Sequence, residues 1–349
     1  MDHSNLNIID TRYMKNSFDL NDKDILITGG TGSLGKALVK EILKKWPKVN
    51  KLIIFSRDEQ KQYNMANDYP SHLYPNIRFF IGDVRDKDRL SRACENVNYI
   101  IHAAAMKHVP IAEYNPDECI KTNIIGAQNV INAAIVNNVN SVVALSTDKA
   151  CAPTNLYGAS KLASDKLFIA ANNIKGKRSL KFSVVRYGNV MGSNGSVIPF
   201  FISKKETGKL PITHKNMTRF NISIDDGVKM VIHALENSWG GELYVPKIPS
   251  YKVTDVAKAV CPDCKLVEIG IRPGEKIHEE MISPADSYFT YEIDNYYVIL
   301  PAKPQWNLED FIKSHKAKKV VMDFHYHSGN NPDFLNVNQI SKLISKLKI

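Results

Sequence analysis

The chain has 349 residues, of which 44% are hydrophobic and 23% charged, and its 46 Lys and Arg outweigh 36 Asp and Glu to give a net charge of +10. These proportions exclude an intrinsically disordered chain and a coiled coil, and the length allows about two domains. No stretch approaches the roughly 18 uncharged apolar residues of a membrane span, and the start, MDHSNLNIID, lacks the basic and then apolar segments of a signal peptide. We therefore expect a soluble cytoplasmic protein with no membrane partner.

The cysteines are too few and too scattered for a disulfide framework in a chain of this length, so we expect reduced thiols at Cys94, Cys119, Cys151, Cys261 and Cys264. Cys261-Pro-Asp-Cys264 has the spacing of half a zinc site, but no second Cys or His pair stands nearby in the sequence. No metal site is predicted.

The positive charge is concentrated at the C-terminal end. Residues 313–349 hold seven Lys and two Asp, which is half of the net charge. They lack the interleaved aromatic and basic residues of single-strand binders, so we interpret this tail as a solvated surface and expect no nucleic-acid partner.

Apolar runs and helical stretches alternate along the first half of the chain. Residues 1–22 are polar and aperiodic, so we expect an N-terminal arm outside the fold. The strands are continuously apolar, which indicates a parallel sheet buried on both faces, and the alternation predicts an α/β fold with a doubly wound sheet. Strands are expected at DILITGG, KLIIFS, IRFFIGD, NYIIHAAA, SVVALST and FSVVRYG, and helices at 34–45, from Glu59, at 87–95, and near 117–138 and 157–173.

The pattern loosens after Gly188, where Gly and Pro become frequent. We predict a first domain over residues 23–190 and a smaller substrate-binding domain over residues 191–349, which includes the basic tail. Helices near 225–237 and 253–260 are expected to pack partly on the first domain.

A glycine-rich loop follows the first strand and opens the first helix. In Thr28-Gly29-Gly30-Thr31-Gly32-Ser33-Leu34-Gly35, the glycines at 29, 32 and 35 allow a tight turn, close approach of a pyrophosphate and close packing of helix on strand. The free N–H groups of the helix start would bind the anion. This loop predicts a Rossmann-like domain that binds a dinucleotide through Gly29, Thr31, Gly32, Ser33, Leu34 and Gly35.

The end of the second strand favours NADP over NAD. Folds that prefer NAD usually carry an acid there for the ribose 2′-hydroxyl. Here Ser56 and Arg57 end the strand and Asp58 comes one residue late, and an Arg fork suits a 2′-phosphate. Further cofactor contacts are expected from Lys61, Asp83, Val84, Ala103, Ala105, Lys107, Leu145, Ser146, Tyr157 and Lys161.

A polar strand end and the helix after it carry the catalytic candidates. Thr147, Asp148 and Lys149 follow an apolar strand, and Tyr157 and Lys161 stand four residues apart on one helix face. An ammonium beside a phenol lowers the pKa of the phenol, so we expect Lys161 to make Tyr157 a usable base for a sugar or alcohol hydroxyl.

Together these motifs resemble the short-chain dehydrogenase/reductase superfamily in its extended form, and within it the UDP-N-acetylglucosamine 4,6-dehydratases that invert C5, the first enzymes of pseudaminic acid synthesis. The resemblance is specific, because Asp148-Lys149 stands where similar C5-retaining dehydratases carry Asp-Glu, and Tyr157 where membrane-bound relatives often have Met. It runs from about Lys23 to Pro301 through TGGTGSLG, SRDEQK, GDVRD, HAAAMKHVPIAEYNP, TNIIGAQNVI, STDKA, YGASK, VVRYGNVMGS, MTRF and IRPGEKIHEEM, with a weaker echo at DFHYHSGNN.

The resemblance implies a lyase in which Tyr157 removes the proton of the sugar 4-hydroxyl, Lys149 takes the C5 hydrogen and Asp148 protonates the departing 6-hydroxyl. Lys149 and Asp148 would both have to be uncharged, and burial favours that form of each. A plain salt bridge between them is the competing interpretation.

The resemblance also implies UDP-N-acetylglucosamine as substrate and a homo-oligomer, hexameric or dimeric. Arg272 would bind the diphosphate and Glu275 the ribose. Asn194 stands where the family loop GNVxGSRGS has Arg. The implied substrate contacts are Lys107, Tyr157, Lys161, Asn189, Val190, Ser193, Asn194, Val197, Thr213, Arg219, Arg272 and Glu275.

Two alternatives stay open at this point. A UDP-sugar 4-epimerase on the same scaffold would use Tyr157 but has no need of Asp148 and Lys149. A non-catalytic NADP-binding regulator, or a nucleic-acid binder that uses the basic tail, would need none of these side chains.

Overall fold

A ten-stranded sheet forms the centre of the computed structural model, which describes residues 18–192 and 196–347. Seven of its strands are parallel and follow the order β3-β2-β1-β4-β5-β6-β10. The order reverses between β1 and β4, which is where doubly wound sheets bind their ligands. The seven strands are β1 (Asp24–Thr28), β2 (Lys51–Ser56), β3 (Ile77–Ile81), β4 (Tyr99–His102), β5 (Ser141–Leu145), β6 (Lys181–Val185) and β10 (Leu243–Pro246).

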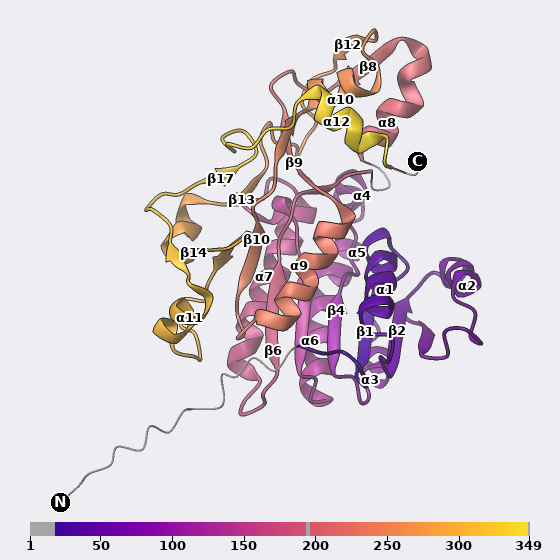
Figure 1. The fold of residues 1–349 in the computed structure, drawn as a ribbon, viewed down its shortest axis with the longest axis vertical. Coiled ribbons are helices and arrows are strands. Elements are labelled where there is room, and N and C mark those ends of the chain that lie inside the picture. Colours follow the sequence, from indigo (N-terminus) through magenta and orange to yellow (C-terminus); the bar gives the residue numbers. More distant parts are fainter. Residues whose placement is uncertain (1–17, 193–195, 348–349) are drawn as a thin grey trace, which may run out of the picture.

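Helices cover both faces of this sheet, as Figure 1 shows. Alternate residues of β1 explain why: Leu26 belongs to the core beneath α3, α6 and α7, whereas Ile25 and Ile27 belong to the core beneath α1 and α9. The predicted doubly wound α/β fold is therefore confirmed. The helices of this part are α1 (Ser33–Lys45), α2 (Glu59–Asp68), α3 (Lys87–Ala93), α4 (Val109–Tyr114), α5 (Pro116–Ile120), a π-helical turn (Lys121–Ile125), α6 (Gly126–Val136), α7 (Leu156–Ile174) and α9 (Ile224–Asn237).

The sheet continues beyond residue 190. Strand β10 joins β6 in parallel, and three antiparallel strands extend the edge in the order β15, β14 and β16. The division near residue 190 stays a prediction, since one sheet runs across it. The added elements are β14 (Thr290–Ile293), β15 (Tyr296–Ile299), β16 (Lys318–Lys319) and α11 (Leu308–His315).

A third apolar core lies in the upper part of Figure 1, between α8, α10, α12 and a pair of short strands. Three small sheets belong to this half of the chain: β11-β9-β7, β12-β8 and β13-β17. Their elements are β7 (Asn189–Val190), β8 (Lys209–Ile212), β9 (Thr218–Ile222), β11 (Ser250–Lys252), β12 (Lys265–Glu268), β13 (Glu280–Ile282), β17 (Tyr326–His327), α8 (Val197–Lys204), α10 (Val253–Val260) and α12 (Val337–Ile344), with 3-10 turns at Asp148–Ala150, Lys205–Thr207 and Pro284–Phe289.

Two sequence expectations change here. Leu20 is fully buried and the ring of Phe18 contacts Trp46, so residues 18–22 pack on the fold rather than outside it. Cys261 and Cys264 form a disulfide, so the expectation of reduced thiols is wrong for this pair, which the CxxC spacing brings into reach. No helix among the described residues is both long and apolar enough to span a membrane.

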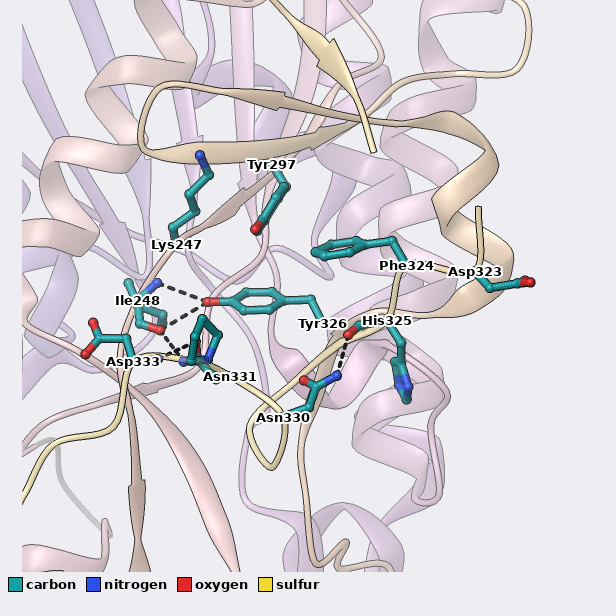
Figure 2. Close-up of a pocket in the computed structure, with 11 residues that line it drawn as sticks. Lys247, Ile248, Tyr297, Asp323, Phe324, His325, Tyr326, Asn330, Asn331 and Asp333 are labelled. Carbon is teal, nitrogen blue, oxygen red and sulfur yellow. Dashed lines mark hydrogen bonds between the residues drawn. The ribbon is translucent and has the colours of Figure 1, made fainter. Parts of the chain in front are cut away.

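The DFHYHSGNN segment, residues 323–331, connects the C-terminal tail to the rest of the fold through hydrogen bonds. The hydroxyl of Tyr326 donates to the carbonyl oxygen of Ile248 and accepts from its N–H, both at 3.1 Å (Figure 2). The Tyr326 ring also lines a cavity of about 540 Å³ with Tyr297 and Phe324. Among the residues that the structure describes, none of the predicted catalytic or substrate-binding residues lines this cavity.

Candidate active site

The glycine loop lies at the carboxyl end of β1, against the strand β4 across the switch point. Gly29 has φ +67°, and a Cβ there would lie 2.9 Å from the backbone nitrogen of Ala104. A Cβ on Gly35 would lie 2.5 Å from the carbonyl oxygen of Gly30. Glycine is therefore required at both positions by close backbone contact.

The start of α1 provides the anion site that this loop requires. Gly32 is the N-cap of α1, and among the described residues no side chain caps this helix. The first-turn N–H groups at Ser33, Leu34 and Gly35 lack intrahelical partners by geometry. This cradle fits the pyrophosphate of a dinucleotide.

Thr28 and His102 support the loop from below. The Thr28 hydroxyl lies 2.8 Å from Nδ1 of the fully buried His102 and accepts hydrogen bonds from the N–H groups of Ala103 and Ala104. Burial lowers the pKa of His102 to about 3. A neutral imidazole thus connects β4 to the end of β1, next to Ala103, one of the expected cofactor contacts.

The end of β2 is charged and partly exposed. Arg57 Nη1 lies 3.6 Å from Asp83 Oδ2. Burial acts to raise the pKa of Asp83, but hydrogen bonds from Arg85 lower it overall. Asp58 caps α2 and pairs with Lys61 at 3.0 Å, so it is occupied within its own helix. Arg57 and Lys61 are both exposed, and Arg57 directly follows the buried Ser56.

The catalytic candidates meet where β5 ends. Thr147 is the N-cap of the 3-10 turn Asp148–Ala150, and α7 follows with Asn155 as its own N-cap. A Cβ on Gly158 would overlap the carbonyl oxygen of Lys149, so the glycine of YGASK lets α7 approach this turn. Tyr157 is thereby placed beside Lys149, and a hydrogen bond joins it to the Thr147 side chain.

Lys149 has an acceptor for each of its three N–H donors. Its Nζ lies 2.9 Å from Asp148 Oδ1, 3.3 Å from Glu279 Oε1 and 3.4 Å from Asn189 Oδ1. Burial alone would lower the pKa of Lys149, but the carboxylates of Asp148 and Glu279 raise it. The competing salt bridge is thus present, and the side chain is an ammonium in this state.

Asp148 carries the buried carboxyl of the group. Its side chain is fully buried, and Oδ2 has no hydrogen-bond partner among the described residues. Burial raises the pKa of Asp148, against the opposing effect of Lys149. The proton-bearing form of this carboxyl is therefore favoured more than in water.

The pKa of Tyr157 differs from the expectation. Burial raises it to about 12, and Lys149 is the nearby cation that opposes this rise most. The pKa of Tyr157 thus lies above the ordinary value of a phenol here, whereas a lowered pKa was expected. Lys161 is buried instead beside Asp165, which opposes the lowering of the pKa of Lys161 by burial.

Asp165 belongs to a buried network beneath α7. Its Oδ2 accepts from the Ser146 hydroxyl at 2.7 Å and from Arg186 Nη2 at 3.2 Å. This network joins the end of β5 to α7 and β6, so it sets the spacing between the catalytic turn and the Tyr-x-x-x-Lys helix.

The IRPGE loop reaches the start of α7. Asn155 Nδ2 donates to the carbonyl oxygen of Gly274 at 2.8 Å, and Arg272 Nε lies 3.7 Å from Glu275 Oε1. Arg272 is exposed, so its guanidinium is open to a ligand on the other side. The loop therefore lies against the N-terminal end of α7, two residues before Tyr157.

The remaining predicted substrate residues lie around this group. The loop that carries Lys107 is joined to α7 because Asn123 bonds both Met106 and Ser160, and partial burial lowers the pKa of Lys107. Ser193 and Asn194 lie outside the described residues. Of the others, Val190 and Val197 are half-buried, and Thr213 and Arg219 are buried.

A family model described as polysaccharide biosynthesis protein matches residues 25–301 of this chain. The chain belongs to this family. It is 55% identical, over 93% of its length and 98% of the relative, to the UDP-N-acetylglucosamine 4,6-dehydratase (inverting) of Campylobacter jejuni. It is 39% identical over 93% of its length, and 96% of the relative, to the UDP-glucose 4-epimerase of Rickettsia bellii.

The fold of this family is also seen in a solved structure. The X-ray structure of Pen from Bacillus thuringiensis superimposes with a TM-score of 0.83 at 36% identity, covering 93% of this chain and 98% of that one. The resemblance stated from the motifs is thus confirmed at the level of the whole chain.

One group in this site was not predicted from the sequence. Glu279 is buried between Lys149 and Arg219, with Oε1 3.3 Å from Nζ of the former and 3.7 Å from Nε of the latter. It stands in IRPGEKIHEEM, a motif that was singled out for Arg272 and Glu275. One signal in the sequence could have indicated it: consecutive residues in extended backbone point to opposite sides, so Glu279 and Glu280 face different surroundings.

Proposed function

We propose that this chain catalyses the 4,6-dehydration of UDP-N-acetylglucosamine with inversion at C5. The observation that carries the proposal is the contact of Asp148 with Lys149 beside Tyr157, in a chain 55% identical to a relative named for that reaction. An epimerase needs only the phenol, whereas elimination of water needs a base for C5 and an acid for the leaving hydroxyl.

We propose NADP as the cofactor. The glycine cradle fits a pyrophosphate, and Arg57 with Ser56 at the end of β2 fits a 2′-phosphate better than an acid would. Bound NADP would supply the hydride acceptor for C4 and the hydride donor for C6 of the sugar, so no net oxidation would occur.

Tyr157 acts as the base for the 4-hydroxyl proton in this proposal. The neighbouring Lys149 and the hydrogen bond with Thr147 both lower its pKa against the effect of burial. Loss of that proton together with the hydride on C4 gives a 4-ketone, and the ketone acidifies the hydrogen on C5.

The Asp148–Lys149 pair performs the elimination. Transfer of one proton from Nζ to Oδ1 across their 2.9 Å hydrogen bond yields a neutral amine and a carboxylic acid, and it needs no other reactant. The amine then takes the C5 proton, and the acid protonates the departing 6-hydroxyl, which leaves as water. Return of a proton to C5 from the opposite face gives inversion.

Substrate binding is assigned to the rim and to the second half of the chain. Arg272 binds the diphosphate, Glu275 the uridine ribose, and Lys107 and Asn189 the sugar and phosphate oxygens. The product, a UDP-4-keto-6-deoxyhexosamine, suits a first step of pseudaminic acid synthesis, and a homo-oligomer is the proposed assembly.

Incubation with UDP-N-acetylglucosamine in heavy water tests this function. Dehydration predicts loss of one water mass and entry of deuterium at C5. Unchanged mass with altered stereochemistry at C4 would instead establish a 4-epimerase, and no change in the sugar would refute both.

A further inference from the structure

Glu279 lies directly before β13 and faces inward. Two hydrogen bonds hold its backbone: its N–H donates to the Ser328 hydroxyl at 3.0 Å, and its carbonyl oxygen accepts from the Ser328 N–H at 2.8 Å. Its neighbour Glu280 points the other way and contacts His325 at 3.1 Å and Lys276 at 3.7 Å. The tail segment that contains Ser328 thus holds one carboxylate inside and leaves the next one outside.

The inward carboxylate lies between two cations. Oε1 of Glu279 is 3.3 Å from Lys149 Nζ and 3.7 Å from Arg219 Nε, and its side chain is only 4% exposed. Oε2 is buried and has no hydrogen-bond partner among the described residues. Arg219 is itself held in place, because Nη1 donates to the carbonyl oxygen of Thr218 at 2.7 Å.

These contacts decide where a proton can reside once Lys149 is neutral. Two buried carboxyls, Asp148 and Glu279, would then remain, and Arg219 is the cation in direct contact with one of them. Like charges that share a low-dielectric site do not both stay ionised, and the carboxyl next to the cation keeps the charge. Arg219 contacts Glu279, so the proton belongs on Asp148.

The surroundings of the group support this division of charge. Burial acts to raise the pKa of Glu279, but Lys149 and Arg219 lower it overall. In contrast, burial and the nearby Glu279 raise the pKa of Asp148. The titratable and charged groups that face Glu279 and its partners include Asp148 and Lys149 after β5, Tyr157 of α7, Arg219 of β9, Tyr251 of β11, and Lys276 and His278 before β13.

We propose that Glu279, paired with Arg219, is a positioning residue that directs the proton leaving Lys149 onto Asp148 and so makes Asp148 the acid for the departing hydroxyl. The step breaks one N–H bond of the ammonium and forms one O–H bond on Asp148. This inference rests on the proposed dehydration.

The test compares the full-length Glu279→Gln variant with the wild type. Loss of a negative charge lowers the pKa of every nearby group, so both limbs of the pH–rate profile should move to lower pH, by about one unit. Water loss should slow by about tenfold or more, KM should change little, and deuterium entry at C5 should exceed water loss.

Two further variants keep the test decisive. Glu279→Asp retains the charge and should keep the wild-type pH profile even if turnover falls. Glu280→Gln removes the outward carboxylate of the next residue. This variant should leave the pH profile and the ratio of C5 exchange to water loss unchanged.

The outcomes separate this inference from the proposed function. A wild type that neither exchanges C5 nor loses water refutes the dehydration itself. A wild type that dehydrates, with a Glu279→Gln variant whose pH profile and exchange ratio are unchanged, overturns only the role of Glu279. If Glu280→Gln shifts the profile equally, the effect is general electrostatics and the inference also fails.

Discussion

Asp148 and Lys149 are neighbours in the chain, and their side chains are also hydrogen-bonded, with Nζ of Lys149 2.9 Å from Oδ1 of Asp148. Because Asn189 and Glu279 accept from the same ammonium, no donor of Lys149 is left over for a substrate. For Lys149 to act on a substrate, either the substrate must displace one of these acceptors or a proton must pass from Lys149 to Asp148.

Replacement of Lys149 by alanine should abolish dehydration and spare cofactor binding. Removal of a general base costs about 10²–10⁴-fold in rate, and the glycine loop that binds the dinucleotide is untouched. Steady-state turnover and NADP titration of the Lys149→Ala variant measure the two effects. Lys166→Ala, an exposed position on α7, is the matched control and should behave as wild type. Near-normal turnover of Lys149→Ala would remove it as the base.

Replacement of Tyr157 by phenylalanine should stop the reaction before C5 is activated. Without the phenol no base removes the 4-hydroxyl proton, so neither water loss nor deuterium entry at C5 is expected in heavy water. Mass spectrometry of the sugar measures both. Tyr114→Phe removes a hydroxyl from a residue that is 87% exposed and should have no effect. Continued C5 exchange in Tyr157→Phe would assign the first proton transfer to another group.

Replacement of Arg57 by alanine should weaken NADP selectively. A hydrogen bond to a charged group contributes about 1.5–3 kcal/mol, so we expect the Kd for NADP to rise roughly 10-fold to 100-fold. The Kd for NAD, which lacks the 2′-phosphate, should change far less. Calorimetric titration of both cofactors measures this, with Arg178→Ala, whose side chain bonds Asn138 on the surface, as the control. Equal losses for both cofactors would argue against a 2′-phosphate contact.

His102 should make the fold less stable in mild acid. Burial lowers its folded-state pKa to about 3, whereas an unfolded histidine titrates near 6.5. Its contribution is fully present above about pH 6.5 and is lost as the pH falls toward 3, by about 2 kcal/mol between pH 6.5 and pH 5. Urea unfolding at pH 7 and pH 5 should show a smaller drop for His102→Asn than for wild type. His72→Asn, at an exposed position, should keep the full drop.

The local motifs were readable from the sequence because each acts over a few residues. The loop from Gly29 to Gly35 could be predicted from its sequence, because a tight turn and a closely packed helix start need glycine at those spacings. Tyr157 and Lys161 share a helix face for the same reason. The continuous apolar strands likewise predicted burial on both sides, and Leu26 and Ile27 enter opposite cores.

Long-range partners were not readable in this way. Glu279 is 130 residues from Lys149 in the sequence, and nothing local indicates that β13 brings its carboxylate to the turn after β5. The burial that raises the pKa of Tyr157, and the presence of Asp165 beside Lys161, likewise depend on packing. The antiparallel strands β14–β16 also join the sheet from far along the chain.

The order of residues was enough to establish the kind of chemistry: a dinucleotide cradle, a phenol, an amine and an acid, each encoded in a short motif. Which of those groups carries charge was settled by folding, because a pKa depends on burial and on neighbours that only packing supplies. Lys149 is an ammonium here because the carboxylates of Asp148 and Glu279 lie against it, and Glu279 comes from the other half of the chain.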